Sequence, residues 1–321
     1  MNVFGVDIDV PMTVIRAIHF AATAITAGAL TFRAVVAEPP FRSARKAGAM
    51  IDAQVRLVAW SGLAVAVVSG AIWLALQTAA MSGQSYGEAL MSGTVITVLN
   101  ETQFGLVSKI RLGLAILLAV CLAYDRSEVS RWLSLGLALS FVAAIAWTGH
   151  AASTPRKLGY LHLTADALHL AAAAAWIGGL VPLALLLNAD RRSQVSARAS
   201  LDPGAIRRFS ALGIISVATL IVSGVINTWI LVGSFRGLIE PGYGWILLFK
   251  IAVFSIMLAF AAVNRFWLTP RLAAAAPASS ARGDTLRGLT RNSLIEIALG
   301  LVIFAVVGVL GTLHPAAHLM K

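Results

Sequence analysis

The sequence is poor in the residues that keep a protein in water. Only 12% of its 321 residues are charged and 59% are hydrophobic, whereas soluble domains average about 25% charged residues. A water-soluble fold could not hide this much apolar surface, because roughly half of its residues would still face solvent. The composition therefore excludes an ordinary soluble protein and indicates a chain surrounded by lipid.

Cysteine is almost absent. The single one, Cys121, lies within an apolar stretch, so the chain can form no intramolecular disulfide and no cysteine-based zinc or haem-attachment site. The sequence also lacks the motifs His-Glu-x-x-His, Gly-x-Ser-x-Gly and Gly-x-x-x-x-Gly-Lys, so neither hydrolysis nor nucleotide-driven pumping is indicated. The chain start lacks the basic region and cleavage site of a signal peptide, and we expect the first span to stay as an uncleaved anchor.

Eight apolar runs are long enough to cross a bilayer, which takes about 20 helical residues. They predict an all-α polytopic membrane protein of eight transmembrane helices with no soluble domain. The polar connection at 80–104 is expected to hold a short interfacial helix. The expected spans are 12–36, 55–79, 105–124, 132–150, 162–188, 208–232, 244–268 and 293–313.

Acidic residues are few, 14 against 25 Lys and Arg, which leaves a net charge of +11. The basic residues lie in short runs between apolar stretches, as in membrane proteins whose orientation they fix, so we expect a lipid bilayer and no nucleic acid as partner. An N-terminus outside places 17 basic residues in inner loops, and predicts that both termini are outside. These 17 are Arg33, Arg42, Arg45, Lys46, Arg56, Arg126, Arg131, Arg191, Arg192, Arg198, Arg207, Arg208, Arg265, Arg271, Arg282, Arg287 and Arg291.

The two halves of the chain, 1–150 and 151–321, resemble each other. Polar residues recur in the same order within equivalent spans. Four spans per half is an even number, so the halves are predicted to be parallel repeats about an axis along the membrane normal. The matches are His19 with His169, Gly28 with Gly178, Ser69-Gly70 with Ser223-Gly224, Lys109 with Lys250, and His150 with His314.

All six histidines are expected on the outer side. His19 and His169 lie about 10 Å inside spans one and five, at 1.5 Å per residue, and ionisable groups within spans usually mark a pathway or a ligand. The alternative is that each ring only hydrogen-bonds a neighbouring helix. Imidazole suits copper, zinc, nickel and iron. We expect His19 and His169, with His150 or His314, to form a metal site between the halves.

Other side chains are candidates for a supporting role. His162 and Asp166 share one helical face with the deep histidine of span five, so this carboxylate is a possible ligand or a group that orients a ring. Arg16 takes the place of Asp166 in the first half, which predicts an ion pair across the interface; the alternative is that each faces water. His318 and Met12 also lie outside, although methionine more often packs than ligates.

A second acid within a span, Glu296, lies near the inner end of span eight. We expect it to pair with Arg265 or Arg291, because an unpaired charge in lipid is costly. The alternative is a place on an exit route for a transported ion.

The segment from His169 through Trp176, Gly178 and Gly179 to Pro182 reads HLAAAAAWIGGLVP. It resembles the signature of the copper resistance protein D (CopD) family. The resemblance implies a bacterial inner-membrane protein that takes up or handles copper. It makes the histidine of this segment and its counterpart in span one the first candidates for copper.

The resemblance continues through SGVINTW, which contains Asn227, and LFKIAVF, which contains Lys250, and covers about 160–313. Together with the tryptophan and glycines of the signature, these positions are assigned to structure or to the pathway. Some relatives carry a fused copper-binding domain, and we expect this protein to have none. The resemblance therefore implies a separate periplasmic partner of the CopC type.

Two functions fit these observations. The first is copper import from the periplasm through the histidine site, driven by the membrane potential, which is worth about 2.3 kcal/mol per charge per 100 mV. The alternative is a membrane electron-transfer protein, since two histidines on facing helices also hold b-type haem. His19 with His169 or His150 would then be the haem ligands, and the protein would be an oxidoreductase; otherwise we expect no enzyme. A haem protein would absorb strongly in the visible range.

The orientation can be tested with reporter fusions. Reporters joined after residues 45, 128, 200 and 280 should read as cytoplasmic, because these positions lie in the expected inner loops with their basic residues. A periplasmic signal at any two of the four would contradict the predicted orientation.

Overall fold

A computed structural model describes residues 2–3, 6–37, 45–125, 127–195, 203–239, 242–276 and 279–315. Four residues discussed above lie outside these ranges. They are His318 and three of the expected inner-loop arginines, Arg42, Arg126 and Arg198.

Nearly all of the described chain is helical. Eight helical segments are long and apolar enough to cross a membrane, and each overlaps one of the expected spans, which confirms the all-helical fold with eight candidate spans. They are Val10–Ala37, Ile51–Ser82, Gln103–Ala123, Glu128–Thr148, Lys157–Asp190, Gly204–Val232, Tyr243–Ala274 and Ser280–Leu310.

Several spans are built from more than one helical element, and short π-helical or 3-10 turns (η) join their parts. The main helices are α1 (Val10–Thr31), α3 (Arg45–Ser82), α6 (Gln103–Ala123), α7 (Glu128–Ala143), α8 (Arg156–Ala173), α9 (Gly179–Val195), α10 (Pro203–Val232), α12 (Tyr243–Val263), α13 (Thr269–Ala274) and α14 (Ser280–Leu310). The joining turns are η1 (Phe32–Ala37), η2 (Ala144–Thr148), η3 (His150–Ser153), η4 (Ala174–Gly178) and η5 (Asn264–Leu268).

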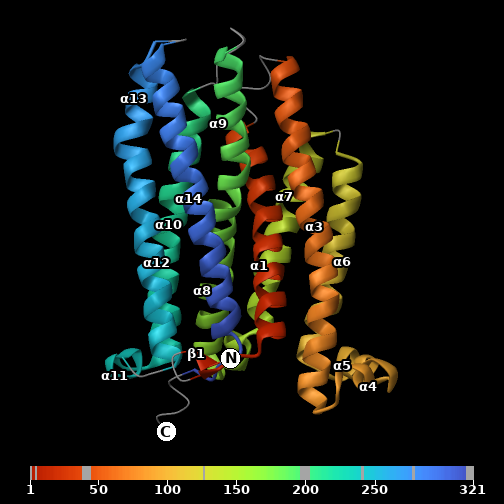
Figure 1. The fold of residues 1–321 in the computed structure, drawn as a ribbon. Helices are drawn as coiled ribbons and strands as arrows, with labels where there is room; N and C mark the ends of the chain where they lie inside the picture. The colour runs from red at the N-terminus through yellow and green to blue at the C-terminus, as the bar shows by residue number, and fades with distance from the viewer. Residues whose placement is uncertain are drawn as a thin grey trace.

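The remaining elements gather at one end of the bundle. Figure 1 shows both termini there, beside α4 (Tyr86–Met91), α5 (Thr94–Glu101), α11 (Phe235–Ile239) and the strand β1 (Asn2–Val3), which pairs with β2 (Val6–Asp7). The polar connection between the second and third spans thus forms two short helices where one was expected. Ser85 and Glu88 cap α4 reciprocally, and these hydrogen bonds lower the pKa of the Glu88 carboxyl.

α1 is the centre of the bundle. In the most apolar window of each span, 83% of the residues are buried for α1 with η1 and 72% for α8 with η4 and α9, against 22% for α10. α1 packs against α3, α7, α14 and η4 (Figure 1). The two spans that carry the deep histidines are therefore the most enclosed, and α10 lies at the periphery.

α1 and η4 touch backbone to backbone. A Cβ atom added to Gly28 would overlap the carbonyl oxygen of Ala174 and the backbone of Gly178, and one added to Gly178 would overlap the carbonyl oxygen of Ala24. Small residues permit such close approach of helices in membranes. This contact joins the two halves of the chain.

Ion pairs of two buried arginines lie at the end of the bundle opposite the termini. Arg33 on η1 pairs with Asp52 of α3 at 2.5 Å and also with Asp125, which follows α6. Arg282 of α14 pairs with Asp190 of α9 at 3.2 Å. Removing one partner of such a pair strands a buried charge, at a cost of about 3–5 kcal/mol.

The glycine contact can be tested by adding a single methyl group. Gly28→Ala should lower the free energy of unfolding in detergent by about 3 kcal/mol, because the new Cβ meets rigid backbone. Gly113→Ala is the matched control, since a Cβ at Gly113 meets nothing within 4 Å. Equal stability of the two variants in denaturant titrations would show that α1 and η4 are not in this contact.

Candidate functional site

His19 is held through both ring nitrogens. Its Nδ1 lies 3.1 Å from Oγ of Ser69, and its Nε2 lies 2.7 Å from Nη2 of Arg111. The hydroxyl of Ser69 donates to the carbonyl oxygen of Val65 at 2.6 Å, so Oγ accepts a hydrogen bond from the N–H of Nδ1. A guanidinium can only donate, so Nε2 accepts. These partners fix the neutral imidazole with its proton on Nδ1.

Arg111 was not among the residues that the sequence analysis selected. It is a buried side chain of α6 whose guanidinium also donates to the carbonyl oxygen of Phe141 and lies 4.3 Å from the centre of that ring. Its signal in the sequence is an arginine inside an apolar run, where ionisable residues tend to be functional. Arg111 lies within the expected span 105–124 but was not considered as a candidate site residue.

His169 makes the same first contact in the second half. Its Nδ1 lies 3.0 Å from Oγ of Ser223, and the hydroxyl of Ser223 donates to the carbonyl oxygen of Thr219 at 2.5 Å. The same reasoning places the ring proton on Nδ1 and a lone pair on Nε2. No described residue hydrogen-bonds this Nε2, so the second half has no counterpart of Arg111.

Each ring also lies against a glycine that follows its serine. A Cβ atom on Gly70 would lie 3.1 Å from Cε1 of His19, and one on Gly224 would lie 3.5 Å from Cε1 of His169. The Ser-Gly pair thus supplies a hydroxyl that orients the imidazole and the space that the ring needs.

Polar residues of three helices surround His169. Asn227 of α10 donates to Oδ1 of Asp166 at 3.3 Å. Lys250 of α12 lies close enough to interact electrostatically with both Asp166 and His169, and Tyr243 interacts with Asp166 in the same way. The site therefore combines an imidazole, a carboxylate, an amide and an ammonium group within the second half.

The predicted ion pair between Arg16 and Asp166 is wrong. The guanidinium of Arg16 is buried 4.9 Å from the ring centre of Trp73, and it packs against Gly311. The face of α1 that carries Arg16 is turned toward α3 and α14, whereas Asp166 faces α10 and α12. The alternative that each faces water is also wrong for Arg16, because its charge is covered by aromatic rings and backbone.

The remaining histidines lie elsewhere. His162 is buried and its Nδ1 lies 2.8 Å from Oγ1 of Thr154, which donates to the carbonyl oxygen of His150. His150 lies close enough to His162 to interact with it electrostatically. His314 is exposed after the end of α14, and Met12 packs in the core.

The described residues contain no cluster of three His, Cys, Asp or Glu side chains that could hold a metal ion. The expected site of His19 and His169 with a third histidine is therefore not assembled in this structure. Nine residues separate each deep histidine from its glycine, Gly28 or Gly178, about two and a half helical turns. The rings consequently lie on the helix faces opposite the contact between the halves, and each points into its own half.

Comparison with known proteins identifies the family. The N-terminal domain profile of copper resistance protein D-like proteins matches residues 7–160, and the copper resistance protein D profile matches residues 203–310. The chain is 30% identical over 280 residues to "Copper resistance protein D" of Pseudomonas syringae pv. tomato, covering 84% of this chain and 87% of that one. This chain belongs to the copper resistance protein D family.

Two further relatives carry informative names. "Copper transport protein CutJ" of Bacillus subtilis (strain 168) is 29% identical over 75% of this chain, which spans 42% of its length. "Inner membrane protein YebZ" of Escherichia coli (strain K12) is 27% identical over 94% of this chain and 97% of its own. No solved structure matches the chain significantly.

Other positions of the copper resistance protein D signature serve packing. Trp176 is buried and meets the ring of Phe254 edge-on at 6.1 Å, and Gly179 lies against Phe209.

The expected ion pair of Glu296 is wrong. Its carboxyl accepts from Asn264 at 2.7 Å, and Arg265 donates to Ser210 instead.

The effects of substituting Asp166 and Lys250, the two charged residues beside His169, on the free energy of unfolding should be coupled. Asp166→Asn or Lys250→Met alone should each lower the free energy of unfolding by about 1–3 kcal/mol, because each leaves a half-buried charge without the opposite charge nearby. The double variant should cost less than the sum of the two. Lys109→Met is the matched control: Lys109 is exposed and bonds only Asn100, so its loss should cost at most about 1 kcal/mol. Additive losses in a denaturant titration would show that Asp166 and Lys250 do not interact.

Proposed function

We propose that this protein imports copper across the bacterial inner membrane from the periplasmic side, with the copper ion as cargo. Three observations support this function. The chain belongs to a copper resistance family, one relative is named a copper transport protein, and another is named an inner membrane protein. The eight candidate spans fit a transporter that lies wholly within the bilayer.

The proposal depends mainly on one observation: the ring of His169 has the orientation and the tautomer that suit metal binding. Ligating histidines almost always donate one ring N–H to a fixed acceptor, which sets the tautomer and aims the other nitrogen at the metal. Ser223 is such an acceptor, and among the described residues the lone pair of Nε2 has no hydrogen-bond partner. We assign His169 as the first copper ligand and Asp166, one turn away, as a ligand or orienting carboxylate.

His19 is its counterpart in the first half. Ser69 orients the ring of His19 as Ser223 orients the ring of His169. Arg111, however, hydrogen-bonds Nε2 of His19, so copper reaches this nitrogen only after the guanidinium moves. His150, His162 and His314 are assigned as capture sites for copper on the way to the deeper rings. Copper first meets these three when a periplasmic protein of the CopC type delivers it.

The equivalence of the two histidine sites supports an origin by duplication. The two halves, 1–150 and 151–321, use the same His, Ser and Gly positions for the same contacts. Both termini lie at one end of the bundle (Figure 1), as an even number of spans requires. With both termini outside, the membrane potential drives a copper cation inward.

The haem alternative has less support from the geometry. Two histidines that hold one haem must present their rings to the same space between facing helices. His19 faces α3 and α6, and His169 faces α10. A visible spectrum of the purified protein separates the two functions, because haem gives a strong Soret band and a bound copper ion does not.

Variants of the second histidine site test the proposal directly. His169→Ala should abolish copper uptake by proteoliposomes with a negative interior, and Ser223→Ala should weaken copper binding about 10–100-fold, because the ring loses its orienting acceptor. Leu168→Ala, at an exposed neighbouring position, is the control and should behave like wild type.

Uptake by His169→Ala at the wild-type rate would place the copper site elsewhere. A Soret band in the wild type that His169→Ala lacks would replace copper transport with the haem function.

A further inference from the structure

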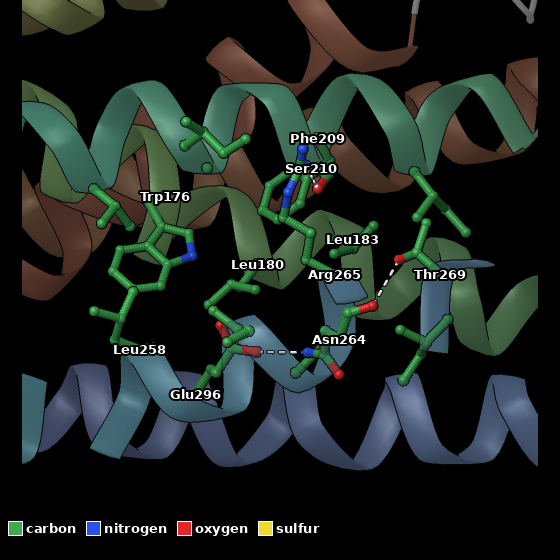
Figure 2. A pocket seen from close by; sticks show the side chains of 18 of the residues that line it. Trp176, Leu180, Leu183, Phe209, Ser210, Leu258, Asn264, Arg265, Thr269 and Glu296 are labelled. Carbon is green, nitrogen blue, oxygen red and sulfur yellow. Dashed lines mark hydrogen bonds between the residues drawn. The ribbon is translucent and has the colours of Figure 1, made fainter. Parts of the chain in front are cut away.

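A cavity of about 570 Å³ lies in the second half, between η4 with α9, α10, α12 with η5, and α14. None of the five histidines that the structure describes lines it. Figure 2 shows Trp176, Leu180 and Phe209 on its walls, with Glu296 and Asn264 on one side. The cavity is thus separate from the proposed copper site.

The cavity has one acidic group. Glu296 is 1% exposed, and Oε1 of its carboxyl accepts from the amide of Asn264 at 2.7 Å. No described residue hydrogen-bonds the other oxygen, Oε2, and no lysine or arginine faces the carboxyl group. The arginine that lines the cavity, Arg265, donates to Ser210 across its edge (Figure 2). The carboxyl group therefore points into the cavity with half of its hydrogen-bonding capacity unused.

The orientation of Asn264 is fixed. Its amide oxygen accepts from Asn292 at 2.9 Å, and Thr269 donates to its backbone carbonyl at 2.8 Å. Its NH₂ group must then face Glu296. One turn earlier on α14, Ser293 is also 1% exposed and lines the cavity, and no hydrogen bond of its hydroxyl group is formed with the described residues. Glu296 and Ser293, on adjacent turns of α14, thus each offer an unused oxygen atom to the cavity.

The rest of the cavity is apolar and reaches the lipid-facing surface. Leu183, Val217 and Leu258 continue the walls. Ile214 and Ile221, on the outer side of α10, are 46% and 47% exposed. Because this part of α10 lies within a candidate span, a ligand would enter sideways from the bilayer.

We infer that this cavity binds an amphiphilic primary amine, whose ammonium group bonds Glu296 and Ser293 and whose apolar body lies against Trp176 and Phe209. An ammonium ligand would supply the opposite charge that lets this buried carboxyl group ionise inside the cavity. Two oxygen acceptors favour an ammonium that carries N–H groups over a quaternary one. Oxygen ligands do not suit copper(I), and the apolar walls do not suit a hydrated metal ion.

The probe is dansylcadaverine, a primary amine with an apolar fluorophore that tryptophan emission excites. It is titrated into the full-length protein in phosphatidylcholine nanodiscs, since this lipid has no N–H ammonium group. Wild type should bind it saturably, and Glu296→Gln should weaken binding at least about tenfold, because a charged hydrogen bond is lost. The N-acetylated probe, which has no charge, should bind the wild type as weakly as the amine binds Glu296→Gln.

Two further variants keep the test decisive if Glu296→Gln folds poorly. Gly213→Leu should abolish binding: Gly213 lines the cavity, and a Cβ there meets nothing within 4 Å, so the side chain fills the cavity without a clash. Glu101→Gln, an exposed carboxyl on α5, should leave binding unchanged, as Glu296→Gln should leave copper binding unchanged. Equal binding of the amine and its acetylated form would overturn the inference. Displacement of the amine by added phosphatidylethanolamine, a lipid with a primary ammonium group, would support it and would identify a lipid headgroup as one source of the ligand.

Discussion

Two glycines, Gly28 and Gly178, let α1 and η4 meet without side chains between them, and the positions of the other helices follow from this contact. It places the two most enclosed spans at the centre of the bundle. Each span then directs its histidine away from the contact, because nine residues turn a helix face through about half a revolution. The ring of His19 hydrogen-bonds side chains of α3 and α6, and the ring of His169 hydrogen-bonds a side chain of α10.

Lipid imposes the second constraint. A polar group without a partner in the hydrocarbon region costs several kcal/mol, so each buried imidazole must find its partners within the bundle. The serines of α3 and α10 satisfy one nitrogen in each half in the same way. The halves differ at the other nitrogen, which meets Arg111 in the first half and no described residue in the second.

The spans, a short helix in the polar connection and the family could be predicted from the sequence, because apolar length and ordered motifs depend only on neighbouring residues. Partners of long side chains could not. Arg16 and Asp166 occupy equivalent positions, yet helix rotation sends one toward Trp73 and the other toward Asn227. The nine-residue spacing between each deep histidine and its glycine is visible in the sequence. It shows that the two rings point away from each other once the contact between the glycines is known. The contact of Arg111 with His19 joins residues 92 positions apart, and no local pattern indicates it.

In the first half, Nε2 of His19 is already occupied by Arg111, a side chain of the same protein. A group tethered beside its partner acts at a high effective concentration, so an ion that approaches His19 competes with a guanidinium already in place. At His169 an incoming ion displaces no donor of the described residues from Nε2. Under the proposed function, metal ions would therefore fill the second half before the first. A cation that displaces Arg111 also takes over a position that already carried positive charge, so loading the first half resembles an ion exchange, whereas loading the second adds the full charge of the ion to the site.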